Sequence, residues 1–302
     1  MEKMLLGKVA VVAGGTRGAG RGIAVKLGEA GATVYVTGRS SRRNGRSDLD
    51  RPETIEETAE LVTKAGGVGI AVRTDHSEPE QVKRLFDQVE REQGGRLDVL
   101  VNDIWGGERL TEWGKPVWEH SLDKGLLMQQ RAVHTHLINC RYGLSLMVKR
   151  GNGLVIEVTD GVDYAYRGSL YYSLAKISII HIAESLAMEL KPHGVAAVSL
   201  TPGFLRSEEM LAHFGVSEEN WKDAVKQEPH FIASETPEYI GAAVVALAAD
   251  SHILGKTGRA LSTWSCADAY GIRDRDGSQP HWGNYYRDVV DDKEKPLTPP
   301  PS

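Results

Sequence analysis

The sequence predicts an α/β fold in which a parallel sheet is covered by helices on both faces. Short runs rich in β-branched residues alternate with amphipathic segments along most of the chain, which is typical of strand–helix–strand units. A glycine-rich segment joins the first such strand directly to the first helix. The chain has 302 residues, 41% of them hydrophobic and 25% charged, so it is long enough for one large α/β domain with a sizeable core.

The elements follow one another in a regular order. The helix over 21–30 ends at Gly31, and the helix over 52–67 opens on a proline and closes on glycine, which are ordinary signals for helix ends. Strands are expected at 8–13, 32–38, 68–75, 96–102, 154–160, 195–203 and 258–263, and helices at 21–30, 52–67, 78–95, 171–190 and 236–250.

These elements form a single predicted domain over residues 1–263. Insertions near 40–55 and 103–130 interrupt the alternation of strands and helices. Residues 264–302 form a charged C-terminal extension that ends in PLTPPPS, and its end is expected to be flexible.

Bulk composition excludes several classes of function. The net charge of -5 and the pI near 6.1 provide no basic surface for nucleic acid. No apolar run approaches the length that spans a bilayer, and the N-terminal segment has no cleavage site of the signal-peptide kind. The two cysteines form no disulfide framework, so a cytoplasmic location is expected. The histidines have no metal-ligand spacing, so no metal site is predicted.

The segment AGGTRGAG, residues 13–20, predicts a dinucleotide site. Gly14, Gly18 and Gly20 stand between the first strand and the first helix, where a pyrophosphate can approach backbone N–H groups and the positive end of the helix dipole. We assign Thr16 of this loop to the same site. A P-loop is disfavoured because no Gly-Lys-Ser/Thr follows.

The residues around the second strand favour NADP(H) over NAD(H). An NAD site usually has an acidic residue at the end of this strand, but the segment 37–46 contains none. Arg39 follows the strand and Arg17 lies in the glycine loop, so two guanidinium groups can bind a 2′-phosphate.

Tyr172 and Lys176 are the candidate acid–base pair. They stand four apart on the helix expected at 171–190, so they share one face, whereas Tyr171 is rotated away and is expected to pack. A nearby ammonium group favours the phenolate and is expected to lower the pKa of Tyr172.

These motifs, together with TPG at 201–203, resemble the short-chain dehydrogenase/reductase family over residues 6–262. The segments GRGIA, AGATVYVTGR, GRLDVLVN and YGIRDRDG are similar to its dehydrogenase/reductase member 1 subgroup. The resemblance implies a Rossmann-like, doubly wound parallel sheet of about seven strands and a nicotinamide cofactor. It also implies a homodimer or homotetramer, and hydride transfer between a small-molecule carbonyl compound and an alcohol.

The resemblance assigns further cofactor-binding residues. Asp75 corresponds to an aspartate that contacts adenine, and Asn102 to the first residue of an Asn-Asn-Ala-Gly element. Pro202 and Gly203 correspond to a loop beside the nicotinamide, and Ser207 to the hydroxyl residue that follows. Lys176 is implied to bind the nicotinamide ribose as well as to tune the tyrosine.

Several positions depart from the family pattern. Thr159 stands where the catalytic serine is expected, and we assign it to steady the reacting oxygen. Asp160 is expected to point away, because neighbours on a strand face opposite sides. Gln130 is the nearest match to the asparagine of the catalytic tetrad. These changes leave open an alternative, a cofactor-binding pseudoenzyme that acts as a sensor or scaffold.

Two further interpretations concern the chemistry. Ser173 and Lys176 also fit the S-x-x-K pattern of serine acyl hydrolases, but no Ser-Asp-Asn element follows and the glycine loop would be unexplained. Aromatic residues gather in the segments where the family has its substrate loops, which indicates an apolar or aromatic substrate. These residues are Trp105, Trp113, Trp118, Tyr164, Tyr166, Phe204, Phe214 and Trp221.

Overall fold

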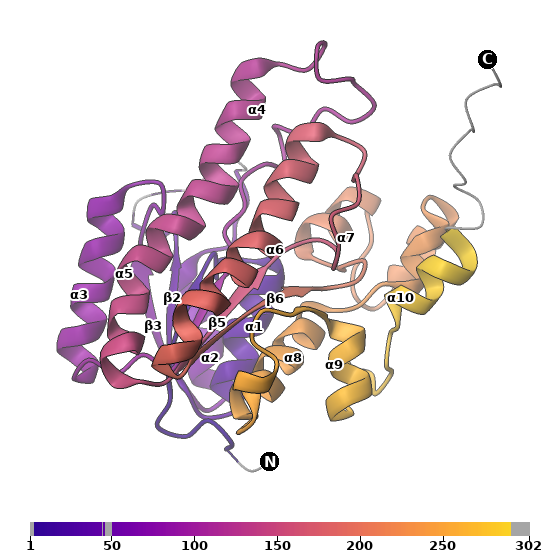
Figure 1. Cartoon of the computed structure of the whole chain (residues 1–302). Coiled ribbons are helices and arrows are strands. Elements are labelled where there is room, and N and C mark those ends of the chain that lie inside the picture. The colour runs from indigo at the N-terminus through magenta and orange to yellow at the C-terminus, as the bar shows by residue number, and fades with distance from the viewer. Residues whose placement is uncertain (1–2, 44, 46–49, 291–302) are drawn as a thin grey trace.

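The computed structural model describes residues 3–43, 45 and 50–290. Seven parallel strands form one sheet in the order β3-β2-β1-β4-β5-β6-β7, which confirms the predicted fold class (Figure 1). The strands are β1 (Val9–Ala13), β2 (Thr33–Gly38), β3 (Val68–Arg73), β4 (Val99–Asn102), β5 (Gly153–Val158), β6 (Val195–Thr201) and β7 (Ala260–Ser262).

Helices cover both faces of the sheet. They are α1 (Gly18–Glu29), α2 (Ile55–Lys64), α3 (Pro79–Gln93), α4 (Leu122–Gln129), α5 (Thr135–Arg150), α6 (Leu170–Leu190), α7 (Glu208–Phe214), α8 (Pro237–Ala249), α9 (Thr263–Tyr270) and α10 (Trp282–Tyr285). One buried cluster joins the sheet to α1, α2 and α8, and a second joins it to α3, α5 and α6. The central strands are therefore buried on both sides, as a parallel sheet requires.

The order of the strands brings the carboxyl ends of β1, β2 and β4 together. Parallel pairing of β1 with both β2 and β4 places the ends of all three strands at one edge. The order reverses at this point, because β2 and β3 lie on one side of β1 while β4 to β7 lie on the other. Open α/β sheets bind ligands at such a position.

The predicted elements are present, with their ends displaced by a few residues. The first helix starts at Gly18 rather than 21, because the glycine loop turns directly into it. Helices α4, α5, α7, α9 and α10 lie outside the elements predicted from sequence. Their apolar patterns are weak, since several of them border the cavity described below rather than a continuous core.

The C-terminal extension packs on the domain as far as the structure describes it. Ser262 caps α9, and α10 brings Trp282 close to Gly203. The predicted flexible end, residues 291–302, lies outside the described residues, as do 44 and 46–49 of the predicted insertion. Among the described helices, none is both long enough and apolar enough to cross a membrane.

Candidate active site

A cavity of about 1390 Å³ opens at the carboxyl ends of the strands. It is lined by most of the residues that the sequence singles out. These are Gly14, Thr16, Arg17, Gly18, Arg39, Asp75, Gln130, Thr159, Tyr172, Lys176, Pro202, Gly203 and Ser207.

The glycine loop forms one wall of this cavity. Gly14 has φ +89, and a Cβ on it would lie 2.1 Å from the carbonyl oxygen of Asp103, so no side chain fits there. Gly20 lies behind the wall rather than in it. A Cβ on Gly20 would meet the Gly14 carbonyl oxygen at 2.4 Å, so its smallness permits the loop to pack on the helix.

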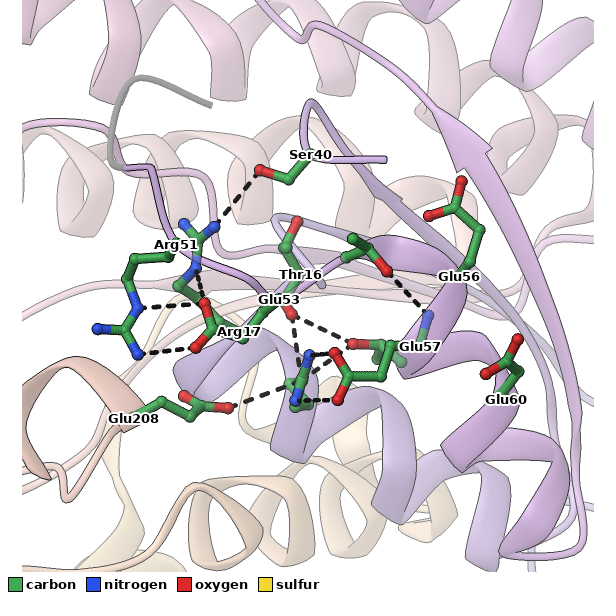
Figure 2. Close-up of polar contacts among 12 residues, drawn as sticks. Thr16, Arg17, Ser40, Arg51, Glu53, Glu56, Glu57, Glu60 and Glu208 are labelled. Carbon is green, nitrogen blue, oxygen red and sulfur yellow. Dashed lines mark hydrogen bonds and ion pairs between the residues drawn. The ribbon is translucent and has the colours of Figure 1, made fainter. Parts of the chain in front are cut away.

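The amide at the start of α1 already holds a carboxylate. The Gly18 N–H donates to Glu208 Oε2 at 2.7 Å, and Arg21 Nε lies 3.6 Å from Glu208 Oε1. Glu208 is the first residue of α7, so this contact joins α7 to the start of α1, and Figure 2 shows Glu208 among the charged residues nearby. This contact shows that an anion fits the helix N-terminus at the place where a dinucleotide has its pyrophosphate.

Arg17 is held in place by an acidic residue that the sequence interpretation missed. Arg17 Nε donates to Glu53 Oε2 at 3.2 Å, and its Nη2 donates to Ser40 Oγ at 3.4 Å. Arg51 donates two hydrogen bonds to the same carboxylate, from Nε at 3.1 Å and from Nη2 at 2.7 Å. Glu53 therefore lies between two guanidinium groups (Figure 2). Burial acts to raise the pKa of Glu53, but the bonds from Arg51 lower it overall. Glu53 is therefore a charged acceptor that holds both guanidinium groups in place.

Asp75 lies on the same side of the cavity. Its Oδ1 accepts from both the N–H and the hydroxyl of Ser77, at 3.0 and 2.6 Å. Burial acts to raise its pKa, yet the Ser77 bonds and the charge of Arg39 lower it overall. Asp75 is therefore a charged acceptor at the end of β3.

Tyr172 and Lys176 meet at the opposite end of the cavity. Lys176 Nζ lies 5.6 Å from the centre of the Tyr172 ring and 4.0 Å over the Trp105 ring. Trp105 and Trp113 pack against Tyr172 with ring centres 5.5 and 5.0 Å away. Burial lowers the pKa of Lys176, although Asp160 and other carboxylates oppose this shift. Tyr171 packs outside the cavity against the His120 ring, 4.9 Å away.

The described residues contain no cluster of His, Cys, Asp and Glu side chains that could hold a metal ion. The site therefore consists of the glycine loop, the arginine residues Arg17 and Arg39, and the pair Tyr172 and Lys176 around one cavity.

Comparison with known proteins agrees with this arrangement. The family model for short chain dehydrogenases matches residues 8–215. The chain belongs to the short-chain dehydrogenase/reductase family. It is thus an oxidoreductase of a family that uses nicotinamide cofactors.

Relatives within the family show which branch the chain resembles. It is 38% identical to mouse dehydrogenase/reductase SDR family member 1 over 281 residues, which cover 92% of this chain and 86% of that protein. It is 30% identical to the 3-oxoacyl-[acyl-carrier-protein] reductase FabG of Aquifex aeolicus, over 85% of this chain and 96% of that protein. A crystal structure of a short chain dehydrogenase from Mycobacterium thermoresistibile superposes with a TM-score of 0.76 over 92% of each chain, at 22% identity.

The hydroxyl of Thr159 does not face the tyrosine of this dehydrogenase. Thr159 Oγ1 donates to the backbone carbonyl of Lys176 at 2.7 Å, which ties the end of β5 to α6. Asp160 takes the predicted place instead: the Tyr172 hydroxyl donates to Asp160 Oδ2 at 2.8 Å. The expectation that Asp160 points away is wrong, because β5 ends at Val158 and the alternation of strand side chains stops there.

The expected pKa of Tyr172 is also wrong in direction. Burial raises the pKa of its phenol, and the negative charge of Asp160 and the hydrogen bond to it raise it further. Lys176 lies over the Trp105 ring, not beside the phenol oxygen, so its ammonium group does not offset these effects. The phenol is a bound proton donor to a carboxylate.

Asn102 does not line the cavity. Its amide donates to Glu157 Oε1 at 2.8 Å and accepts from Asn139 Nδ2 at 2.7 Å, in full burial under the ends of β4 and β5. Glu157 Oε2 lies 2.5 Å from His136 Nδ1, and His136 Nε2 lies 3.1 Å from the Ile104 carbonyl oxygen. Asn102 thus belongs to a buried network that also holds the segment 103–105, which borders the cavity. The sequence signal for this network is Glu157, a glutamate within an otherwise apolar strand, because a buried carboxylate needs hydrogen-bond partners.

Gln130 lies at the cavity wall, where α4 passes into a π-helical turn over Gln130–His134. Of the aromatic residues predicted near the substrate, Trp105, Trp113, Tyr166 and Phe204 line the cavity. Trp221 instead packs against Arg206 and Phe231, with the guanidinium carbon 4.1 Å from its ring centre. The C-terminal segment supplies Trp264, Trp282 and Tyr286, which the sequence interpretation left in an extension.

Proposed function

We propose that this dehydrogenase interconverts a carbonyl compound and an alcohol with NADP(H). The observation that carries the proposal is one cavity bounded by the glycine loop at its first end and by Tyr172 and Lys176 at its second. The bound nicotinamide would supply or accept the hydride. The protein residues bind, orient and move the proton.

Three groups of residues would bind the three parts of the cofactor. The N-terminus of α1 receives the pyrophosphate, Asp75 receives the adenine, and Pro202, Gly203 and Ser207 border the nicotinamide. The Gly18 N–H, which holds the Glu208 carboxylate, supports the first of these assignments.

The proposed preference for NADP(H) rests on the arginine residues near the glycine loop, Arg17, Arg39 and Arg51. Arg17 and Arg51 share one carboxylate, Glu53, and Arg39 lines the same part of the cavity. Arg17 and Arg39 both line the cavity, so their guanidinium groups can bind a 2′-phosphate. Glu53 would hold Arg17 in position.

Proton transfer is assigned to Tyr172, with Lys176 on the ribose. Asp160 accepts a hydrogen bond from the Tyr172 O–H, so it orients the hydroxyl. Thr159 acts through Lys176, since its hydroxyl bonds the lysine carbonyl. Gln130 would contact the substrate or an intervening water from the π-helical turn.

The substrate is proposed to be apolar or aromatic in its larger part. The rings of Trp105, Trp113, Phe204, Trp264 and Trp282 line the cavity between the pair and the C-terminal segment. Aromatic walls with few polar groups are usual for sites that bind such compounds.

Assembly and location complete the proposal. Exposed apolar side chains lie on α4, α5 and α6, with Leu126 56%, Leu137 50% and Met188 81% exposed. Such side chains on adjacent helices support a homodimer or homotetramer, which light scattering of the purified protein would test.

The two cysteines, Cys140 and Cys266, are free and buried, which supports a cytoplasmic location.

A pseudoenzyme remains a second candidate because of one observation. The phenol proton of Tyr172 is held by a carboxylate, which makes the tyrosine a poor acid. This arrangement would suit a sensor or scaffold that binds the cofactor with little turnover.

Two measurements test the proposals. Titration of the protein with NADPH and NADH, followed by fluorescence, should show tighter binding of NADPH. Arg39→Glu should remove most of that preference, because one charge-assisted contact contributes roughly 1.5–3 kcal/mol. Equal or tighter binding of NADH by the unaltered protein would refute the cofactor assignment. Turnover of a carbonyl panel with NADPH separates the enzyme from the pseudoenzyme.

A further inference from the structure

Asp160 stands at a point where ordinary carbonyl reduction is hindered. Its Oδ2 lies 2.8 Å from the Tyr172 hydroxyl oxygen, so it is within reach of any group next to the reacting oxygen. Negative charge develops on that oxygen during hydride addition to a neutral ketone, and a carboxylate beside it opposes this. A substrate with a positive charge next to the reacting oxygen would offset this repulsion.

The cations nearby do not neutralise Asp160 by direct contact. Lys176 Nζ lies over the Trp105 ring. Arg167 Nη1 donates to the Ala165 carbonyl at 2.6 Å, and its Nη2 donates to the Asp163 carbonyl at 2.7 Å. Within the residues that the structure describes, Asp160 forms no ion pair, and its one hydrogen-bond partner is Tyr172. The carboxylate is therefore available to a cation that enters the cavity.

A cation beside Asp160 would make the Tyr172 hydroxyl a better proton donor. While Asp160 holds its proton, Tyr172 has a strongly raised pKa because of burial and the adjacent charge. A cation paired with Asp160 would remove the opposing charge and free the hydroxyl for the reacting oxygen. The surrounding rings of Trp105 and Trp113 tolerate positive charge, as the position of Lys176 over Trp105 shows.

We propose that the substrate is a 1,2-amino alcohol or the matching α-amino ketone, with its protonated amine on Asp160 and its oxygen on Tyr172. This inference rests on the proposed carbonyl–alcohol function and names its substrate class. The amine remains intact. In the reductive direction the carbonyl carbon gains a hydride from NADPH and the carbonyl oxygen takes the proton of the Tyr172 hydroxyl, so that C–H and O–H bonds replace the second bond of the C=O group. The Tyr172 phenolate that remains takes a proton from water. In the oxidative direction the same steps run in reverse, so the phenol first gives its proton to water and then accepts the proton of the alcohol. Binding of the ammonium group thus activates the tyrosine for its own substrate.

A matched pair of alcohols tests the charge. In 2-amino-1-phenylethanol and 1-phenyl-1-propanol an ammonium group and a methyl group occupy the same place, so size is nearly constant. We expect kcat/KM with NADP⁺ to be at least roughly ten-fold higher for the amine, as a charge-assisted contact would give. A neutral alcohol that is oxidised as well as the amine would overturn the proposal, while the oxidoreductase assignment would stand.

A binding measurement decides the case in which neither alcohol is turned over. Calorimetric titration of the protein–NADP⁺ complex with 2-phenylethylamine, which has no reacting hydroxyl, should give a Kd that Asp160→Asn weakens roughly ten-fold. Glu119→Gln, an exposed change of the same charge outside the cavity, should leave the Kd unaltered. Equal Kd values for the unaltered protein and Asp160→Asn would refute the inference. Failure of the protein to bind NADP⁺ at all would instead refute the proposed function.

Discussion

Two adjacent tyrosines at the start of α6 have opposite surroundings. Tyr172 faces the cavity and donates to Asp160, whereas Tyr171 packs against His120 and closely approaches Gly125. A helix turns far enough between neighbours to separate the two side chains. One phenol can therefore reach a substrate, and the other supports the packing of α4 on α6.

Tyr172→Phe should abolish most turnover while NADPH binding is retained. The ring still packs against Trp105 and Trp113, but the hydroxyl that moves the proton is absent, and general acid–base groups contribute roughly 10²–10⁴-fold. Steady-state kinetics and NADPH fluorescence check the two parts. Tyr171→Phe is the matched control, and a larger loss from it than from Tyr172→Phe would show that the wrong tyrosine has been assigned.

At the scale of elements, α7 would compete with a bound cofactor for a backbone amide of α1. Glu208 at the start of α7 accepts the Gly18 N–H at the start of α1. A pyrophosphate at this helix end would need the same donor and would be repelled by the carboxylate. Cofactor binding is therefore expected to displace the Glu208 side chain.

Glu208→Gln should tighten NADPH binding several-fold, because it removes a competing anion and its repulsion of the pyrophosphate. Direct titration at low and high salt measures the effect, which should shrink as salt screens the charges. Glu80→Gln, at an exposed position of α3, provides the control. Weaker binding of NADPH by Glu208→Gln would contradict this, and would mean that the carboxylate instead stabilises the position of α7 against the bound cofactor.

Strand β5 contributes a buried carboxylate that connects several elements. Glu157 is fully buried and accepts from Asn102 on β4 and from Cys140 on α5, at 2.8 and 3.2 Å. His136 of α5 completes the set. These contacts hold the end of β4, and with it the segment that carries Trp105, against α5.

Glu157→Leu should therefore destabilise the protein by roughly 2–4 kcal/mol, because buried donors lose their acceptor. Urea unfolding measures the change. Glu189→Leu, at an exposed position of α6, should alter the free energy of unfolding by less than about 0.5 kcal/mol. Similar effects of the two substitutions would exclude a structural role for the network.

At the scale of the whole molecule, the C-terminal segment completes the domain. Glu235, just before α8, accepts from Gly203 N–H at 3.0 Å and from Thr263 Oγ1 at 2.8 Å. It thus joins the loop that contains Gly203 to α9. Its second oxygen, Oε1, is buried without a partner among the described residues, and burial raises the pKa of Glu235 to about 8.

This raised pKa makes stability depend on pH in a defined direction. The folded protein keeps the Glu235 proton up to about pH 8, whereas the unfolded chain loses it near its ordinary value of 4.5. The stabilising effect of protonation is complete below the unfolded pKa and is lost as the pH rises through the folded one. Glu235→Gln cannot ionise, so its Tm should rise relative to the unaltered protein from pH 5 to pH 9. Thermal unfolding at both pH values checks this, and a constant difference would contradict it.

The sequence by itself determined the fold class, the glycine loop and the tyrosine–lysine pair. These depend on local patterns, because glycine spacing, strand–helix alternation and the i, i+4 relation are properties of adjacent residues. Tyr172 could be chosen over Tyr171 for the same reason.

Tertiary structure alone decided what surrounds these residues. Asp160 and Tyr172 are 12 positions apart, Arg17 and Glu53 are 36 apart, and Gly18 and Glu208 are 190 apart. No local pattern predicts such contacts, since they arise where strand order and loops bring distant segments to one edge of the sheet. For that reason the sequence assigned the reacting oxygen to Thr159, whereas folding turns that hydroxyl to the Lys176 carbonyl and places the Asp160 carboxylate beside the tyrosine.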